Sequence, residues 1–159
     1  MRRSMPSTAI LLGLLGLLGF VGCGLIALGE DPTKGGQGFN ALIAYAAVML
    51  SFVGAVHWGL ALGVGAATRR VQRLRYTLGV LPALIGWVAL LLPLFVPPWT
   101  SLVLLIAGFI AAMVVEARWA HLGYTPGRYT ALHWLVTVVV VAVLGCVLAI
   151  RLLGAHISF

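Results

Sequence analysis

Residues 45–62 read YAAVMLSFVGAVHWGLAL and contain no Asp, Glu, Lys or Arg. An α-helix rises about 1.5 Å per residue, so about 20 apolar residues cross the roughly 30 Å hydrocarbon core of a bilayer. Apolar and small residues continue on both sides of this stretch. The sequence therefore predicts a membrane-spanning helix over about residues 40–67, around which the other segments are arranged.

The composition of the whole chain agrees with a membrane location. Hydrophobic residues make up 62% of the 159 residues, charged residues only 8%, and the mean hydropathy is +1.13. In a typical soluble domain about a quarter of the residues are charged. The surface of this protein is therefore expected to face lipid, and its length fits a single transmembrane domain, residues 1–159.

Segments rich in Gly, Pro or Arg divide the chain into five apolar runs. We expect a loop over residues 29–38 and an arginine-rich loop before residue 77. Because a bilayer offers no hydrogen-bond partners to backbone groups, each spanning segment must be helical. We predict an all-α integral membrane protein, a compact bundle of five transmembrane helices at about residues 9–28, 40–67, 77–94, 100–120 and 129–153.

Small residues recur at every fourth position of the helix predicted at residues 40–67. They are Ala47, Ser51, Ala55, Gly59, Gly63 and Ala67. Residues four apart share one face of a helix, and small side chains let two helices approach closely in lipid. We predict that this face packs against the helices at residues 9–28 and 77–94, so that the helix is central.

Basic residues are distributed unevenly between the two sides of the predicted membrane domain. One side has Arg2, Arg3, Arg69, Arg70, Arg73, Arg75, Arg118 and Arg128, and the other has Lys34 and Arg151. Lys and Arg accumulate in cytoplasmic loops. We therefore predict that the N-terminus and the arginine-rich loop are cytoplasmic, or on the equivalent matrix side, and that the C-terminus is outside.

The net charge of +7 could also indicate a nucleic-acid partner. No basic domain lies outside the predicted spans, so we expect no nucleic-acid binding. The arginines at positions 69–75 are explained by their role in topology, and they are also a candidate site for anionic lipid.

An ionisable residue, His57, lies within the predicted central span. Counted from the predicted helix ends, His57 and Trp87 are each ten residues, about 15 Å, from the cytoplasmic boundary, at similar depth. A polar group buried in lipid either bonds a neighbouring helix and stays neutral or contributes to a functional site. The candidates for a ligand cavity or polar core are His57, Trp58, Trp87, Tyr45 and Ser51.

A second polar group is expected at the cytoplasmic boundary. Its members are Glu116, Arg118, Trp119, His121, His133 and Trp134. Glu116 follows Gly108 and Ala112 at intervals of four, so it should face a neighbouring helix. Ion pairing is expected with Arg69, Arg70, Arg73 or His133. The alternative interpretation is a belt of aromatic and charged side chains that sets helix depth.

No catalytic motif, phosphate-binding loop or metal-ligand spacing occurs in the sequence, so we expect no enzyme activity, cofactor or metal. Cys23 and Cys146 lie in apolar runs and are expected to be buried thiols. Cys23 ends a Phe-Val-Gly-Cys sequence similar to a lipoprotein box. The apolar run continues to Leu28, which favours a spanning helix over a cleaved signal.

Residues 44–62, with their Ser-Phe-x-Gly and x-Trp-Gly core, resemble a small membrane family of unknown function whose animal member is called transmembrane protein 69. The resemblance continues through residues 81–87 and 124–126. In that family the residue before the tryptophan is His or Arg, and Ala55 here replaces a usual glycine. The resemblance implies a bacterial inner-membrane or mitochondrial-type protein and carries no activity.

Two functional hypotheses follow. The first is a non-catalytic accessory or assembly partner of another membrane complex. The second is a binder or transporter of a small molecule, porphyrin-like or lipid-like, or of an ion, with a cavity near His57. Size, span number and tryptophan content are also similar to the tryptophan-rich sensory and translocator proteins, although their early tryptophan-proline patterns are absent.

Overall fold

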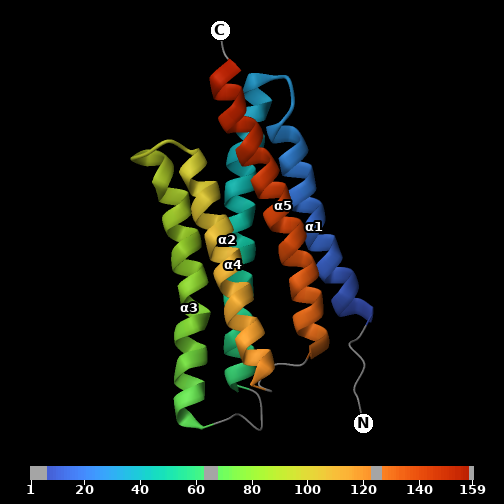
Figure 1. Cartoon of the computed structure of the whole chain (residues 1–159), viewed down its shortest axis with the longest axis vertical. Coiled ribbons are helices and arrows are strands. Elements are labelled where there is room, and N and C mark those ends of the chain that lie inside the picture. Colours follow the sequence, from blue (N-terminus) through green and yellow to red (C-terminus); the bar gives the residue numbers. More distant parts are fainter. Residues whose placement is uncertain (1–6, 63–67, 123–126, 158–159) are drawn as a thin grey trace. The chain divides into compact units, whose positions relative to one another are not determined.

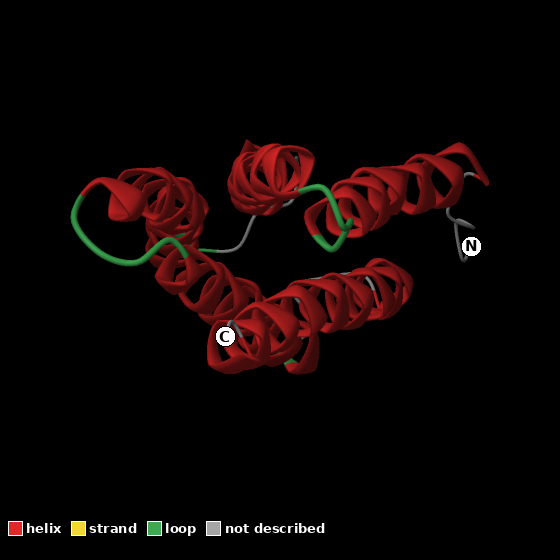
Figure 2. Cartoon of the chain, turned by 90° about the horizontal axis from the view of Figure 1, so that it is seen from above, coloured by secondary structure: helices red, strands yellow, loops and turns green. Residues whose placement is uncertain are grey.

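The computed structural model describes residues 7–62, 68–122 and 127–157, which form helices joined by short turns, with no strand among them (Figures 1 and 2). The elements are α1 (Ser7–Ala27), α2 (Pro32–Leu62), α3 (Arg69–Leu91), the 3₁₀ turn η1 (Leu92–Leu94), α4 (Trp99–His121) and α5 (Gly127–Ile157). Five helices are long and apolar enough to cross a membrane. The predicted all-α class is confirmed, and five helices have the length and apolar composition expected of the predicted spans.

Contacts between residues divide the chain into two compact units. One contains residues 1–42 and 113–159, and the other contains residues 43–112. Helices α2 and α4 each contribute residues to both units. The first unit therefore has α1, α5 and one end of each of these two helices, whereas the second has α3 and the remainder of them.

In the first unit, α1 packs against α5 through glycines, and the two helices run parallel (Figure 1). A Cβ built on Gly13 would lie 3.5 Å from Leu132 Cδ2, and one built on Gly24 would lie 3.1 Å from Val143 Cγ1. The small size of these two glycines therefore lets α5 lie close to α1.

Helix α2 begins inside the segment predicted to be a loop, so the prediction of a loop over residues 29–38 is wrong beyond Asp31. The carboxylate of Asp31 accepts hydrogen bonds from the backbone N–H groups of Thr33 at 2.9 Å and Lys34 at 3.2 Å. These N–H groups have no partner within a helix, and Pro32 has the backbone angle that a first helical residue needs. This N-cap outweighs the low helix propensity of the glycines that follow.

In the second unit, α2 and α3 are antiparallel and approach closely at glycines. A Cβ on Gly54 would collide with the carbonyl oxygen of Gly79, and one on Gly86 would lie 2.8 Å from the carbonyl oxygen of Ala47. The hydroxyl of Ser101 on α4 donates to the carbonyl oxygen of Ala89 on α3 at 2.7 Å. Glycine contacts therefore bring α2 and α3 close together, and a buried hydroxyl joins α4 to α3.

The buried face of α2 differs from the predicted one. Its inward positions alternate in steps of four and three, at Ile43, Ala47, Leu50, Gly54, His57 and Ala61. Of the predicted series, Ala47 belongs to this face, Ala55 and Gly59 are exposed, and the positions beyond residue 62 lie outside the described residues. Steps of four drift around a helix of 3.6 residues per turn, whereas alternating steps stay on one face.

Helix α3 begins at Arg69, so the predicted arginine loop is helical from that residue onward. Arginine is a good helix former, and Thr68 at the N-cap position provides the carbonyl that accepts from the N–H of Gln72. Pro82 is consequently in the middle of the helix, where it leaves one backbone carbonyl without its usual donor. Of the two cysteines expected to be buried, Cys23 is half-buried and Cys146 is exposed.

Candidate functional site

Glu116 is a fully buried carboxyl group on α4 in the first unit, with a relative exposure of 1%. It follows the buried residues Gly108 and Ala112 on the same face of the helix, as its spacing predicted. Its Oε2 atom lies 3.7 Å from Nε2 of His133 on α5, which is itself 8% exposed. Glu116 therefore faces a neighbouring helix and lies beside His133, one of its expected partners, and the ion pairing of the two stays a prediction.

Tyr129 completes this group, which we call the Glu116 cluster: Glu116, Tyr129 and His133. Tyr129 precedes His133 by one helical turn, and their rings stack with centroids 6.0 Å apart and planes inclined by 14°. The Tyr129 side chain also interacts with the Glu116 carboxyl group. Sequence reasoning missed Tyr129, although its spacing of four from His133 places both on one face of α5.

The cluster contains two titratable side chains, Glu116 and His133, that are both buried. Neither Glu116 oxygen has a donor with good hydrogen-bond geometry among the described residues. A buried carboxylate without a compensating charge costs several kcal/mol or more. One proton carried by either partner leaves Glu116 and His133 together with no net charge, so the pair is suited to hold that proton.

The other predicted members of the boundary group have different environments. Arg118 and His121 are exposed at the end of α4, and Trp134 is 42% exposed next to buried His133. These side chains fit the interpretation of an interfacial belt. Arg69, Arg70 and Arg73 belong to the second unit, where they are exposed near the start of α3. Their pairing with Glu116 stays a prediction.

In the second unit, His57 lies near the end of α2 with a relative exposure of 4%. The neighbouring charged group is Arg75 of α3, which is 6% exposed and acts electrostatically on His57. Nη1 of Arg75 donates to the carbonyl oxygen of Leu60 on α2 at 2.6 Å. Arg75 therefore links α3 to α2 in addition to any role in topology.

The burial of Arg75 was missed in the sequence, where it belonged to a run of arginines. A signal was present, because Arg75 precedes Gly79, Pro82 and Gly86 in steps of four, three and four, and all four residues are buried on α3. Arg73, which is off this face, is exposed. The spacing thus separates the buried arginine from the exposed ones.

Trp58 of α2 contacts α3 next to Arg75. Its indole Nε1 donates to the carbonyl oxygen of Tyr76 at 3.1 Å, and the two rings meet edge to face with centroids 5.3 Å apart. The indole also lies where a Cβ on Gly79 would be, so this glycine makes room for the ring. The indole N–H of Trp58 therefore takes part in the contact between α2 and α3.

His57 and Trp87 are not at the same depth, contrary to the prediction. Contacts pair Gly54 with Gly79 and Ala47 with Gly86, so His57 lies level with Tyr76 of α3. Trp87 is eleven residues further along, about 16 Å at 1.5 Å per residue. The prediction counted from helix ends at residues 67 and 77, and the start of α3 at Arg69 changes the register.

The remaining cavity candidates are also apart. Trp87 is 60% exposed. The hydroxyl of Ser51 donates to the carbonyl oxygen of Ala47 in its own helix at 2.8 Å. Half-buried Tyr45 precedes His57 by twelve residues, about 18 Å of helix. The structure therefore brings His57 together with Arg75 and does not gather the five candidates around one space.

Comparisons with known proteins agree with the membrane character of the chain. A family described as a protein of unknown function (DUF3429) matches residues 5–149. The chain is similar to transmembrane protein 69 of Xenopus tropicalis, with 32% identity over 139 residues, which is 87% of this chain and 53% of that protein. The chain thus spans about half the length of the curated relative it matches. No solved structure matches.

Proposed function

We propose a function from the premise that this chain belongs to the DUF3429 family, a family of unknown function, as its resemblance at residues 44–62 predicted. The protein is a non-catalytic accessory component that binds another membrane protein through the outward face of α2. Its N-terminus is cytoplasmic and its C-terminus outside, in a bacterial inner membrane or its equivalent, as the distribution of arginines indicates.

The observation that carries the proposal is a second regular seam on α2. Exposed residues on this helix also alternate in steps of four and three, at Val48, Phe52, Ala55, Gly59 and Leu62. Alternating steps keep the five side chains on one face, as in helices that pack along their length. The seam thus has the regular spacing of a helix-packing surface.

The shape of this seam favours a helix over lipid. Its two central residues, Ala55 and Gly59, are small, whereas Phe52 and Leu62 on either side are 64% and 73% exposed. A Cβ added to Gly59 would meet no atom within 4 Å. Small residues between larger ones form a groove that lets a second backbone approach closely, the usual means of helix association in membranes.

The test exploits the open space at Gly59. Gly59→Leu fills the groove without contacting the packing of the chain itself, so the protein should fold normally and lose its partner. Gly22→Leu on α1 is a matched control, because a Cβ there also meets no atom within 4 Å. The full chain and both variants are purified in mild detergent, and the stoichiometry of associated membrane proteins is measured by mass spectrometry.

A partner that is present with the wild type and the Gly22→Leu variant and lost with the Gly59→Leu variant supports the proposal. Repeated recovery of the wild-type chain alone would count decisively against an accessory role. Recovery as a homo-oligomer that Gly59→Leu dissociates would replace the accessory role by self-association.

A second candidate function is binding of an ion, and the Glu116 cluster favours it. Ionisable side chains inside membrane spans commonly mark ion or proton pathways. Glu116 is more buried than His57 and has no well-aligned donor among the described residues, so the cluster is the stronger candidate. Proton uptake on reconstitution into pH-loaded vesicles, lost in Glu116→Gln, would be the distinguishing result.

A further inference from the structure

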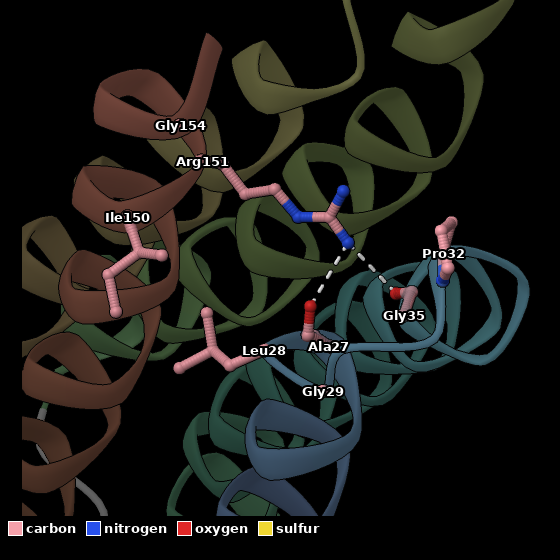
Figure 3. Close-up of a pocket in the computed structure, with 8 residues that line it drawn as sticks. All are labelled: Ala27, Leu28, Gly29, Pro32, Gly35, Ile150, Arg151 and Gly154. Atoms are coloured by element: carbon pink, nitrogen blue, oxygen red, sulfur yellow. Dashed lines mark hydrogen bonds between the residues drawn. The ribbon is translucent and has the colours of Figure 1, made fainter. Parts of the chain in front are cut away.

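A cavity of about 450 Å³ lies at the opposite end of the first unit from the Glu116 cluster (Figure 3). It is formed where α1 ends, α2 begins and α5 approaches its own end. Its lining residues are Ala27, Leu28, Gly29, Pro32, Gly35, Ile150, Arg151 and Gly154. Because three helices end or begin here, the cavity is at one boundary of the predicted spans.

The positive charge in this cavity belongs to Arg151. Its Nη2 atom donates to the carbonyl oxygens of Ala27 at 3.1 Å and Gly35 at 2.9 Å, and its guanidinium carbon lies 5.0 Å from the ring centroid of Phe39. These contacts hold the guanidinium in a defined position across α1, α2 and α5. The site is therefore preorganised.

Arg151 has donors left after these bonds. A guanidinium group has five N–H donors, and the two carbonyls use the two on Nη2. Figure 3 shows the other terminal nitrogen directed away from both carbonyls. No carboxylate of the described residues pairs with Arg151. The nearby carboxylate of Asp31 is occupied by the first N–H groups of α2.

A guanidinium that pairs with no carboxylate of the described ranges and lies at a membrane boundary attracts an oxyanion, and the planar arrangement of its donors suits phosphate. The apolar side chains of Leu28 and Ile150 line the same cavity and would contact the glycerol and the first methylene groups of a lipid. We propose that this cavity binds a phospholipid, with its headgroup phosphate on Arg151. The proposal is independent of the partner surface on α2.

The test measures the thermal unfolding midpoint of the delipidated full chain in detergent. Dihexanoyl phosphatidylglycerol should raise the midpoint in a concentration-dependent way, because a ligand that binds the folded state stabilises it. Dihexanoylglycerol, which lacks the phosphate, should have no effect. An equal shift with inorganic phosphate would reject a lipid in favour of a free anion, and equal shifts with both lipids would reject a phosphate site.

Two pairs of variants locate the effect. Arg151→Gln should weaken the apparent affinity about tenfold or more, whereas Lys34→Gln, at the same boundary but outside the cavity, should leave it unchanged. Because Arg151→Gln also removes two structural bonds, Gly154→Leu tests the site with Arg151 intact. Its control is Gly145→Leu on the same helix, and a Cβ at either glycine meets no atom within 4 Å.

Loss of the lipid-induced shift in Gly154→Leu and its retention in Gly145→Leu supports the proposal. Retention of the full shift in both Gly154→Leu and Arg151→Gln would overturn it, because the lipid would then bind elsewhere on the chain.

Discussion

Glu116 Oε2 lies 3.7 Å from His133 Nε2, and the two side chains are 1% and 8% exposed. The partners come from two different helices, α4 and α5, near the end of one and the start of the other. Each side chain therefore provides a polar neighbour for the other at a position that is shielded from solvent.

Replacing one member of this pair should lower the free energy of unfolding far more than replacing both. We expect Glu116→Leu to lower the free energy of unfolding by about 3 kcal/mol, because it takes the neighbouring carboxyl group away from the buried Nε2 of His133. The double variant Glu116→Leu, His133→Leu should recover most of the loss. Reversible unfolding in mixed detergent micelles measures both. Exposed Arg118 is the control, and Arg118→Ala should change stability by less than about 0.5 kcal/mol.

The close approach of α2 and α3 at Gly54 should tolerate no side chain. A Cβ at this position collides with the carbonyl oxygen of Gly79, so Gly54→Ala is expected to destabilise the protein by about 1–3 kcal/mol. Gly59→Ala adds the same methyl group to the same helix in open space and should be nearly neutral. Equal unfolding midpoints for the two variants would show that the helices are not in contact at Gly54.

The hydrogen bond from Arg75 to α2 predicts an unequal effect of two arginines on one helix. Arg75→Gln removes a charged donor from the carbonyl of Leu60, and we expect a loss of about 1.5–3 kcal/mol. Arg73→Gln removes an equal charge from an exposed position and should cost less than about 0.5 kcal/mol. Similar unfolding free energies for both variants would assign Arg75 a role in topology alone.

Membrane orientation can be tested independently of stability. A periplasmic reporter enzyme fused after Phe159 should be active, and a cytoplasmic reporter at the same position should be inactive, because the proposed topology places eight of the ten basic residues on the opposite side from the C-terminus. The opposite pattern would reverse the proposed topology. Replacement of Arg69, Arg70 and Arg73 by alanine should lower the fraction of correctly oriented chains.

Several features could be predicted because a single physical requirement determines them. Membrane thickness sets the length of an apolar run, so five spans were visible in the sequence. The cost of a carboxyl group in lipid directs Glu116 toward another helix, and its spacing from Gly108 and Ala112 showed on which face. The N-cap at Asp31 was missed, because the glycines after it concealed the start of α2.

The faces and registers of the helices were settled only by tertiary structure. On α2 both the buried and the exposed series of residues have helical spacing. Sequence periodicity cannot say which series faces inward, because both contain small residues. Which face of α2 is buried depends on the neighbouring helix α3. Gly54 faces Gly79 of α3, and the hydrogen bonds of Arg75 and Trp58 fix the register of the two helices close to this contact. The sequence by itself thus determined where the helices lie along the chain and that they are long and apolar enough to cross a membrane. The tertiary contacts decided that His57 meets Arg75, that Trp87 is elsewhere, and that Arg151 lines a cavity, because each depends on side chains distant in the chain.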